Sequence, residues 1–422
     1  MHARFEPAAR RLAALLAILL LPIVADGHTT GIHPPLILVS IDGYRADYLD
    51  RGHSPILSAL ASDGVRSQGM RPVFPSLTYP NHYTLVTGLY PDQHGIVSNS
   101  MHDPVLGNFS PSNRAANTDG RWWDQAEPLW VTAEKQGLRT ASVFYPGTQA
   151  EIHGVRPSYW QLFDSSVQPD ARVDQALQWF DLPTTQRPKL ISLYFEQVDV
   201  AGHNYGPDSL QVDEAMMTVD AALGRLVDGL RQRGMFETTN IVVLSDHGMS
   251  ATSADRVVLM DQIVNVEHIE LVTSIVNAGI NPKPGYEAEV ERALLAPHPH
   301  LQCWRKSGVP KNFHYGHNGR IPAIVCVTDD GWMITTASTA SRTAHVPLGE
   351  HGYDNNEPQM RALFVGRGPA FKQHLSVPVF DNIHVYALLA KLSGVTPRPN
   401  EGRLAVSARM LREPGGSGTM EQ

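Results

Sequence analysis

Four short, largely apolar runs constrain the fold of this 422-residue chain more than any other feature of its sequence. They fall at residues 36–41, 141–145, 190–195 and 241–245, and stretches with helical patterns lie between them. Runs of this length that are apolar on both faces are typical of strands buried in a parallel sheet. Strands that alternate with helices require those helices to cover both faces of the sheet. The pattern therefore predicts an α/β fold with a mostly parallel central sheet.

A long helix and an insertion are expected in the second half of the chain. Apolar residues recur every three or four positions over residues 208–233, which predicts an amphipathic helix. Asp208 and Gln211 resemble a capping pair at its start, and Gly234 marks its end. Residues 255–345 are rich in proline, histidine and short β-like runs, so we expect a small α+β insertion there.

The chain begins with the pattern of a secretory signal peptide. Basic residues precede a 14-residue apolar run at 12–25, which is shorter than the ~20 residues that span a bilayer. We interpret residues 1–27 as this signal, with a buried helix or an uncleaved anchor as alternatives, and expect a periplasmic or secreted protein. No later stretch of the sequence is long enough to span a membrane. Residues 28–412 are expected to form the folded domain, and residues 413–422 a disordered tail.

The net charge limits the kinds of ligand the chain can bind, and its two cysteines permit one disulfide. With 34 Lys and Arg against 42 Asp and Glu the chain has a formal charge of −8, which argues against a surface that binds a nucleic-acid polymer. A small anionic substrate is still compatible, because a bound metal would supply positive charge. In an exported protein Cys303 and Cys326, which lie in or beside strand-like runs, permit a disulfide; the alternative is two buried free thiols.

Three of the predicted strands lead to an aspartate: Asp42, Asp199 and Asp246. The carboxyl ends of parallel strands meet at one edge of a sheet, where α/β proteins bind ligands. His203 and His247 follow two of these aspartates at ligand spacing, and mixed sets of aspartate and histidine suit zinc. The alternative for any one of these residues is an ordinary turn or cap. Taken together they predict a metal site at this edge of the sheet.

Thr78 is the candidate nucleophile. It lies between Pro75 and Pro80 at the start of a helix-like stretch, where a hydroxyl beside a cation can be activated as an alkoxide. Periodicity alone favours the alternative that Thr78 merely caps the helix.

Several long segments of the sequence resemble the nucleotide pyrophosphatase/phosphodiesterase family of the alkaline phosphatase superfamily. They are SIDGYRADYL, FPSLTYPNHYTLVTGLYPDQHGIVSN, EQVDVAGHNYGP, VLSDHGM and HGYDNNEPQMRALFVGRGPAF, in family order from about residue 36 to 371. The resemblance implies an alkaline-phosphatase-like three-layer sandwich in which residues 28–412 form the phosphodiesterase catalytic domain, with the insertion within it.

The resemblance also assigns roles to individual residues. It implies two zinc ions, one held by Asp42, Thr78, Asp246 and His247 and the other by Asp199, His203 and His351. Thr78 matches the nucleophile and Asn99 the asparagine that binds a phosphate oxygen. Tyr79 matches the aromatic residue that stacks on the base, and Phe163 the opposite wall of that slot. His82 and His94 belong to the same motifs without being ligands and are expected to be structural.

The activity implied by the resemblance is hydrolysis of phosphodiester or pyrophosphate bonds through a covalent threonyl-nucleotide intermediate, with release of nucleoside 5′-monophosphates. The neutral amide of Asn99 favours a diester, which carries one negative charge fewer than a monoester dianion. The alternatives are a phospholipid head-group phosphodiesterase, a phosphate monoesterase, and a non-catalytic, metal-stabilised binding protein. The last is disfavoured because every matched ligand and the nucleophile are present.

Overall fold

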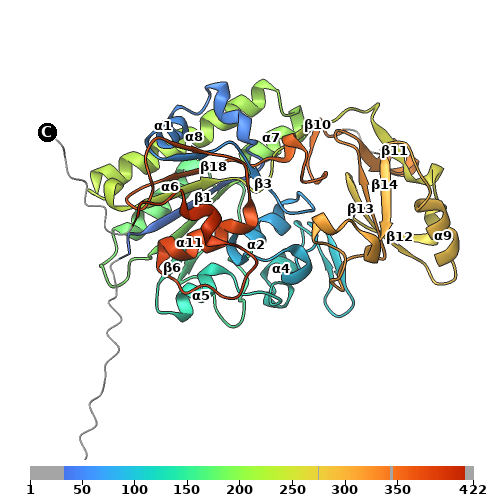
Figure 1. The fold of residues 1–422 in the computed structure, drawn as a ribbon, viewed down its shortest axis with the longest axis horizontal. Helices are drawn as coiled ribbons and strands as arrows, with labels where there is room; N and C mark the ends of the chain where they lie inside the picture. The colour runs from blue at the N-terminus through green and yellow to red at the C-terminus, as the bar shows by residue number, and fades with distance from the viewer. Residues whose placement is uncertain (1–32, 274, 343–345, 414–422) are drawn as a thin grey trace, which may run out of the picture. The chain divides into compact units, whose positions relative to one another are not determined.

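The structure is a computed structural model that describes residues 33–273, 275–342 and 346–413. The predicted signal peptide at 1–27 and the tail from residue 414 lie outside the described residues. An eight-stranded sheet runs through the described part, with the strand order β19-β2-β18-β9-β1-β8-β6-β7 (Figure 1).

The four predicted strands lie next to one another in this sheet, and each pairs in parallel with the next. They are β9 (Asn240–Leu244), β1 (Leu36–Ile41), β8 (Leu190–Phe195) and β6 (Thr140–Val143). In register, Leu36 lies between Leu190 and Asn240. The sheet is completed by β7 (Tyr159–Trp160), β18 (Phe364–Arg367), β2 (Val65–Ser67) and β19 (Leu375–Val377). Strand β18 is antiparallel to both of its neighbours, β9 and β2. The expectation of a mostly parallel central sheet is confirmed.

Helices cover both faces of the sheet, as the alternation of side chains along β1 requires. Leu36 and Leu38 belong to one buried cluster, with helices α2 (Thr78–Thr87), α5 (Leu129–Lys135) and α11 (Val385–Ser393). Ile37 and Val39 point to the other, with α1 (Pro55–Asp63), α6 (Pro169–Phe180) and α8 (Leu210–Gln232). Figure 1 shows α1 and α8 on one side of the sheet and α11, α2 and α5 on the other. The predicted three-layer α/β sandwich is therefore confirmed.

The long predicted helix is α8, but its expected capping pair is wrong. The helix begins at Leu210, and the residue before it, Ser209, accepts a hydrogen bond from the Val212 amide at 3.3 Å. Asp208 instead forms an ion pair with Arg51 at 2.5 Å. The serine hydroxyl at the N-cap satisfies a free amide of the first turn, which is the role that the sequence assigned to the aspartate one residue earlier.

The region interpreted as an insertion contains a sheet of its own. Its antiparallel strands, in the order β12-β13-β15-β14, are Ile269–Thr273, Asn277–Pro282, Ile324–Thr328 and Leu301–Arg305. Helix α9 (Glu287–Leu294) packs its buried residues Val290 and Leu294 against this sheet. Strands β11 (Val257–Leu259) and β16 (Met333–Thr335), toward the two ends of this region, pair in parallel with each other. Its identity as a separate subdomain at 255–345 stays a prediction.

The predicted disulfide is present in this smaller sheet. Cys303 in β14 lies directly opposite Cys326 in β15, and the two sulfurs are bonded. The bond therefore joins two adjacent antiparallel strands, as the sequence indicated.

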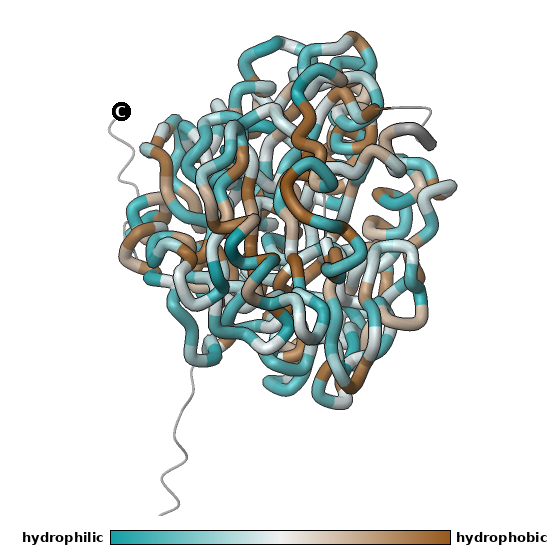
Figure 2. The backbone as a smooth tube through the Cα atoms, turned by 90° about the vertical axis from the view of Figure 1, so that its right-hand side faces the viewer, coloured by the Kyte–Doolittle hydropathy of each residue, from teal (hydrophilic) through white to brown (hydrophobic). Residues whose placement is uncertain are grey.

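Hydrophobic and hydrophilic residues are interspersed along the backbone in Figure 2. Among the described helices, none combines the length and the apolar character needed to cross a bilayer.

Candidate active site

The candidate metal ligands meet beyond the carboxyl end of the parallel sheet. Two of the aspartates follow strands, and the third lies in a helix. Asp42 directly follows β1, and Asp246 follows β9 after one residue, as expected. Asp199 does not end a strand: β8 ends at Phe195, and Asp199 lies in the first turn of α7 (Gln197–Tyr205). Because His203 is four residues later on the same helix, its Nε2 lies 3.5 Å from Asp199 Oδ2. The predicted position of Asp199 in the sequence pattern was wrong, yet the residue still reaches the site.

Gly43 allows the three aspartates to approach one another. Its backbone has a φ of +67°, and its amide donates to Asp246 Oδ1 at 3.2 Å. A Cβ at this position would lie 2.9 Å from the Cα of Asp199. A larger residue after Asp42 would therefore push α7 away and separate the carboxylates.

Two groups of potential metal ligands result, and His247 belongs to both. Asp42, Asp246 and His247 form the first group, and Asp199, His247 and His351 the second, each with its ligand atoms within 4.8 Å of one another. His247 Nε2 lies 3.0 Å from Asp246 Oδ2 and 3.4 Å from Asp42 Oδ1. His203 lies outside the second group but touches it through Asp199. The structure thus brings together all six aspartate and histidine residues expected to bind metal.

Each of these histidines is held with the same ring nitrogen facing the aspartates. Nδ1 donates to a main-chain oxygen at 2.9 Å in all three: His247 to Gly248, His351 to Ser76 and His203 to Gly349. A backbone acceptor at Nδ1 fixes the tautomer and leaves the Nε2 lone pair for a metal. This is the orientation that metal-binding histidines usually have.

The carboxylates carry oxygens that no donor among the described residues satisfies. Asp42 Oδ1, Asp199 Oδ1 and Asp246 Oδ2 are buried without a hydrogen-bond partner. A buried, unpaired carboxylate oxygen is costly, and here each also faces an imidazole lone pair. A divalent cation satisfies both kinds of atom at once, and oxygen with imidazole nitrogen is a donor set that zinc accepts. The residues present therefore fit a metal.

The pKa values of the three aspartates depend on their burial and on the charges next to them. Burial raises the pKa of Asp42 well above its usual value, and the charges of Asp246 and Asp199 raise it further. Burial also raises the pKa of Asp199. For Asp246 the effect of burial is outweighed by His247 and His82, which hold its pKa well below the usual range. Nearby positive charge is what each of these carboxylates requires in order to stay ionised.

Thr78 is the first residue of α2, and its hydroxyl faces the first group of ligands. Oγ1 lies 3.3 Å from His247 Nε2, and the N-cap position is occupied by Leu77. The alternative that Thr78 serves as the cap is therefore wrong. One turn later, His82 contacts the Thr78 main-chain oxygen through Nδ1 at 2.9 Å and Ser40 Oγ through Nε2 at 2.8 Å. Both ring nitrogens of His82 are engaged, in agreement with a structural role.

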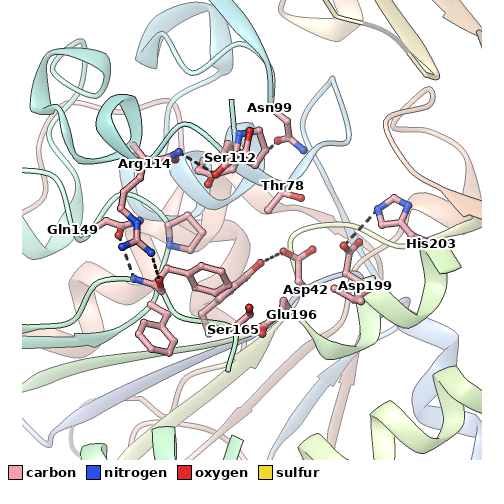
Figure 3. Close-up of a pocket in the computed structure, with 18 of the residues that line it drawn as sticks. Asp42, Thr78, Asn99, Ser112, Arg114, Gln149, Ser165, Glu196, Asp199 and His203 are labelled. Carbon is pink, nitrogen blue, oxygen red and sulfur yellow. Dashed lines mark hydrogen bonds and ion pairs between the residues drawn. The ribbon is translucent and has the colours of Figure 1, made fainter. Parts of the chain in front are cut away.

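The predicted substrate residues line one cleft beside Thr78, with a volume of about 490 Å³ (Figure 3). Tyr79 and Phe163 are part of its wall, with Asn99 close to Thr78. Asn99 Oδ1 accepts a hydrogen bond from the Tyr79 amide at 2.8 Å, which leaves its Nδ2 donor for a ligand. Asp246 and His247 lie deeper and are fully buried.

Sequence reasoning missed further residues of this cleft. The hydroxyl of Tyr194 donates to Asp42 Oδ2 at 2.5 Å, although the residue belongs to a run read only as apolar. Glu196 lines the cleft and is bound at 2.5 and 2.8 Å by Arg172, which is completely buried. Arg114 and Gln149 lie at the end of the cleft opposite Asp199 and His203 (Figure 3). Glu196 directly follows the apolar run 190–195, whereas nothing in the sequence around Arg114 or Gln149 indicates a site.

Comparisons with known proteins are consistent with this site. A family model described as type I phosphodiesterase/nucleotide pyrophosphatase matches residues 36–354. An uncharacterized pyrophosphatase/phosphodiesterase of Schizosaccharomyces pombe is 36% identical over 405 residues, covering 91% of this chain and 82% of that protein. Human ectonucleotide pyrophosphatase/phosphodiesterase family member 1 is 36% identical over 394 residues. That match covers 90% of this chain and 42% of the human protein, so the chain spans less than half of that relative.

A solved structure has the same fold. Murine ectonucleotide pyrophosphatase/phosphodiesterase 5, an inactive threonine-to-alanine variant in complex with AMP, superimposes with a TM-score of 0.85 and 35% identity. The match covers 90% of this chain and 100% of the murine chain.

Proposed function

Because the chain belongs to the type I phosphodiesterase/nucleotide pyrophosphatase family, we propose that it is a two-zinc enzyme that cleaves nucleotide phosphodiester or pyrophosphate bonds and releases nucleoside 5′-monophosphates. The observation that carries this proposal is the convergence of unpaired carboxylate oxygens and imidazole nitrogens beside the Thr78 hydroxyl. The inactive threonine variant of the murine relative and its bound AMP support both the nucleophile and the ligand class.

The proposed ligands divide into two sets. Asp42, Thr78, Asp246 and His247 would hold one zinc ion, and Asp199, His203 and His351 the other. When bound, such ions lower the pKa of a coordinated hydroxyl and neutralise negative charge on the phosphate and the leaving oxygen. The shared proximity of His247 to both groups supports two adjacent ions rather than two remote ones.

The chain's own residues then perform the transfer. Thr78 Oγ1 releases its proton to solvent and attacks phosphorus, a bond from oxygen to phosphorus forms, and the bond to the leaving oxygen breaks, which leaves the nucleotide covalently on Thr78. Thr78 is the first residue of α2, so the positive end of the helix dipole faces the phosphate. Asn99 Nδ2 donates to a non-bridging oxygen. Water then cleaves the new bond, restores the threonine hydroxyl and releases the monophosphate.

The base is proposed to lie between Tyr79 and Phe163, which both line the cleft. Aromatic walls hold a planar base by stacking without recognising its edge. Tyr194 keeps Asp42 in place through its short hydrogen bond, so that one carboxylate oxygen stays directed at the metal site.

We also propose that the protein is secreted or periplasmic. Three observations support export to an oxidising compartment. They are the apolar N-terminal run, the Cys303–Cys326 disulfide and the similarity to ectonucleotide pyrophosphatase/phosphodiesterases.

A comparison of three substrates tests the reaction class. The zinc-loaded protein should cleave a 5′-nucleotide p-nitrophenyl diester at least about tenfold more efficiently, in kcat/KM, than p-nitrophenyl phosphate, because Asn99 is a neutral donor suited to a monoanion. It should also exceed the rate on p-nitrophenylphosphorylcholine, which offers no base for Tyr79 and Phe163. A preference for the monoester would replace the proposed function by a phosphate monoesterase, and a preference for the choline diester by a phospholipid head-group phosphodiesterase.

Replacing Asn99 by alanine should lower kcat/KM for the nucleotide diester about 100-fold, the usual cost of losing one donor to developing charge. Asn99→Asp should be worse than alanine because it places a negative charge beside the phosphate. Zinc content should stay unchanged in both variants. Steady-state kinetics with metal analysis measures this, and wild-type activity in Asn99→Ala would exclude contact with the phosphate.

A further inference from the structure

One arginine in the cleft is not neutralised. Arg114 lines the same cleft as Tyr79 and Phe163, and its Nη2 donates to the main-chain oxygen of Phe163 at 3.4 Å. Among the residues that the structure describes, no carboxylate forms an ion pair with it. The carboxylate of Asp164, the residue after Phe163, accepts from Ser166 instead. The Arg114 guanidinium therefore lies at the edge of the proposed base slot with most of its donors free.

The other arginine near the cleft is in the opposite situation. Arg172 is completely buried, and its guanidinium is bound to Glu196 through two hydrogen bonds. This pairing engages both oxygens of the Glu196 carboxylate, which lines the cleft. Arg172 is thus a structural cation, whereas Arg114 is available to a ligand.

A second donor lies beside Arg114. Gln149 Oε1 accepts a hydrogen bond from the Phe163 amide at 3.3 Å, so the Nε2 end of the same side chain is left to donate. Figure 3 shows Arg114 and Gln149 together at one end of the cleft, with Thr78 in the middle and Asp199 and His203 at the other. A nucleotide whose phosphate is at Thr78 and whose base is between Tyr79 and Phe163 would direct the edge of the base toward these two donors.

We propose that Arg114, with Gln149, selects bases that present carbonyl acceptors, and guanine above all. Guanine offers O6 and N7 as adjacent acceptors to a guanidinium fork, whereas adenine offers N7 beside an amino group that would face a second donor. The same rule favours uracil over cytosine. This inference rests on the proposed function, since it requires a base in the aromatic slot.

The positive charge of Arg114 can affect catalysis in two ways, by attracting the anionic nucleotide and by recognising the edge of the base. Attraction of any anionic nucleotide by Arg114 would raise kcat/KM for every base equally. Recognition of the base edge changes the ratio between bases instead. The ratio of kcat/KM between two bases is therefore the quantity to measure. A lysine at position 114 keeps the attraction for the anionic nucleotide but lacks the planar guanidinium fork that recognises the base edge.

The experiment uses the 5′-p-nitrophenyl esters of GMP and AMP, which share leaving group, sugar and charge, on the zinc-loaded protein. Wild type should favour the guanine ester about five- to tenfold in kcat/KM, the lower part of the range for a bidentate contact because Arg114 is exposed. Arg114→Met should bring the ratio close to one, and Arg114→Lys should lose most of it. Inhibition constants for GMP and AMP should change in parallel. Arg121→Met is the matched control, because Arg121 is an exposed arginine paired with Asp119 and does not line the cleft.

A wild-type ratio near or below one would overturn the inference, as would an unchanged ratio in Arg114→Met. An equal fall in both rates at constant ratio would also overturn it, because it would show long-range attraction alone. Bis(p-nitrophenyl) phosphate, a diester without a base, keeps these results distinct from a failure of the proposed function. Its cleavage by wild type and by all Arg114 variants shows intact chemistry and folding. No cleavage of it or of either nucleotide by wild type would contradict the proposed function itself.

Discussion

Replacing Thr78 by alanine is expected to lower kcat for a nucleotide diester at least about 1000-fold, because the covalent step loses its nucleophile. The hydroxyl lies at the start of α2, and its Oγ1 is 3.3 Å from His247 Nε2. Thr78→Ser should retain measurable turnover, since it keeps the attacking oxygen and loses only a methyl group. Stopped assays with the 5′-p-nitrophenyl ester of a nucleotide would measure both variants.

The control for this substitution is Thr218→Ala. Thr218 is an exposed residue of α8, where its hydroxyl donates to the Glu214 main-chain oxygen. The same atoms are removed there from a residue that does not line the cleft, so kcat should be unchanged. Wild-type turnover by Thr78→Ala, with its metal content intact, would rule out Thr78 as the nucleophile.

Removal of metal is the second change with a large expected effect. Dialysis against a chelator should abolish turnover and lower the melting temperature, and addition of about two zinc ions per chain should restore both. The physical reason is the group of buried carboxylates, because Asp42, Asp199 and Asp246 each keep an oxygen without a partner when no cation is bound. At zinc concentrations about 100 times the dissociation constant, binding at one site would add ~2.7 kcal/mol to the free energy of unfolding.

Replacing one of the proposed metal-binding residues should weaken zinc binding in the same way. Asp246→Asn should reduce the zinc bound per chain and the melting temperature of the loaded protein. Asp228→Asn is the matched control, since Asp228 is an exposed aspartate that pairs with Arg231 on the surface of α8. Elemental analysis and thermal melts are the measurements. A protein that keeps its activity and melting temperature through chelation would contradict a metal-dependent mechanism.

The sequence predicted the centre of the fold because the signal there is local. Runs such as 36–41 are apolar on both faces, and this pattern alone requires a buried strand with helices on both sides. The position of Asp199 was harder to predict. The strand ends at Phe195 and a helix begins at Gln197, but nothing in the continuous segment LISLYFEQVD marks the boundary between them. Boundaries of this kind depend on backbone hydrogen bonds that single-sequence patterns do not reveal.

The remaining site residues depend on tertiary contacts. Tyr194 reaches Asp42 because β8 pairs in register with β1, where Ser40 lies opposite Tyr194. Nothing in the apolar run that contains Tyr194 indicates a polar role. Arg114 lies in the short helix α4 (Arg114–Thr118), far in sequence from Phe163, which it contacts. By contrast, Cys303 and Cys326 could be paired from the sequence because both lie at or next to strands that are close along the chain.

The most direct test of the proposed mechanism is to trap the nucleotide on the protein. Zinc-loaded enzyme mixed with excess nucleotide diester and quenched in acid within milliseconds should gain the mass of one nucleoside monophosphate less one water, and peptide mapping should place the adduct on Thr78. Thr78→Ala should show no such adduct under the same conditions. An adduct on another residue, or rapid product formation by the wild type with no adduct at any quench time, would contradict a covalent reaction at Thr78.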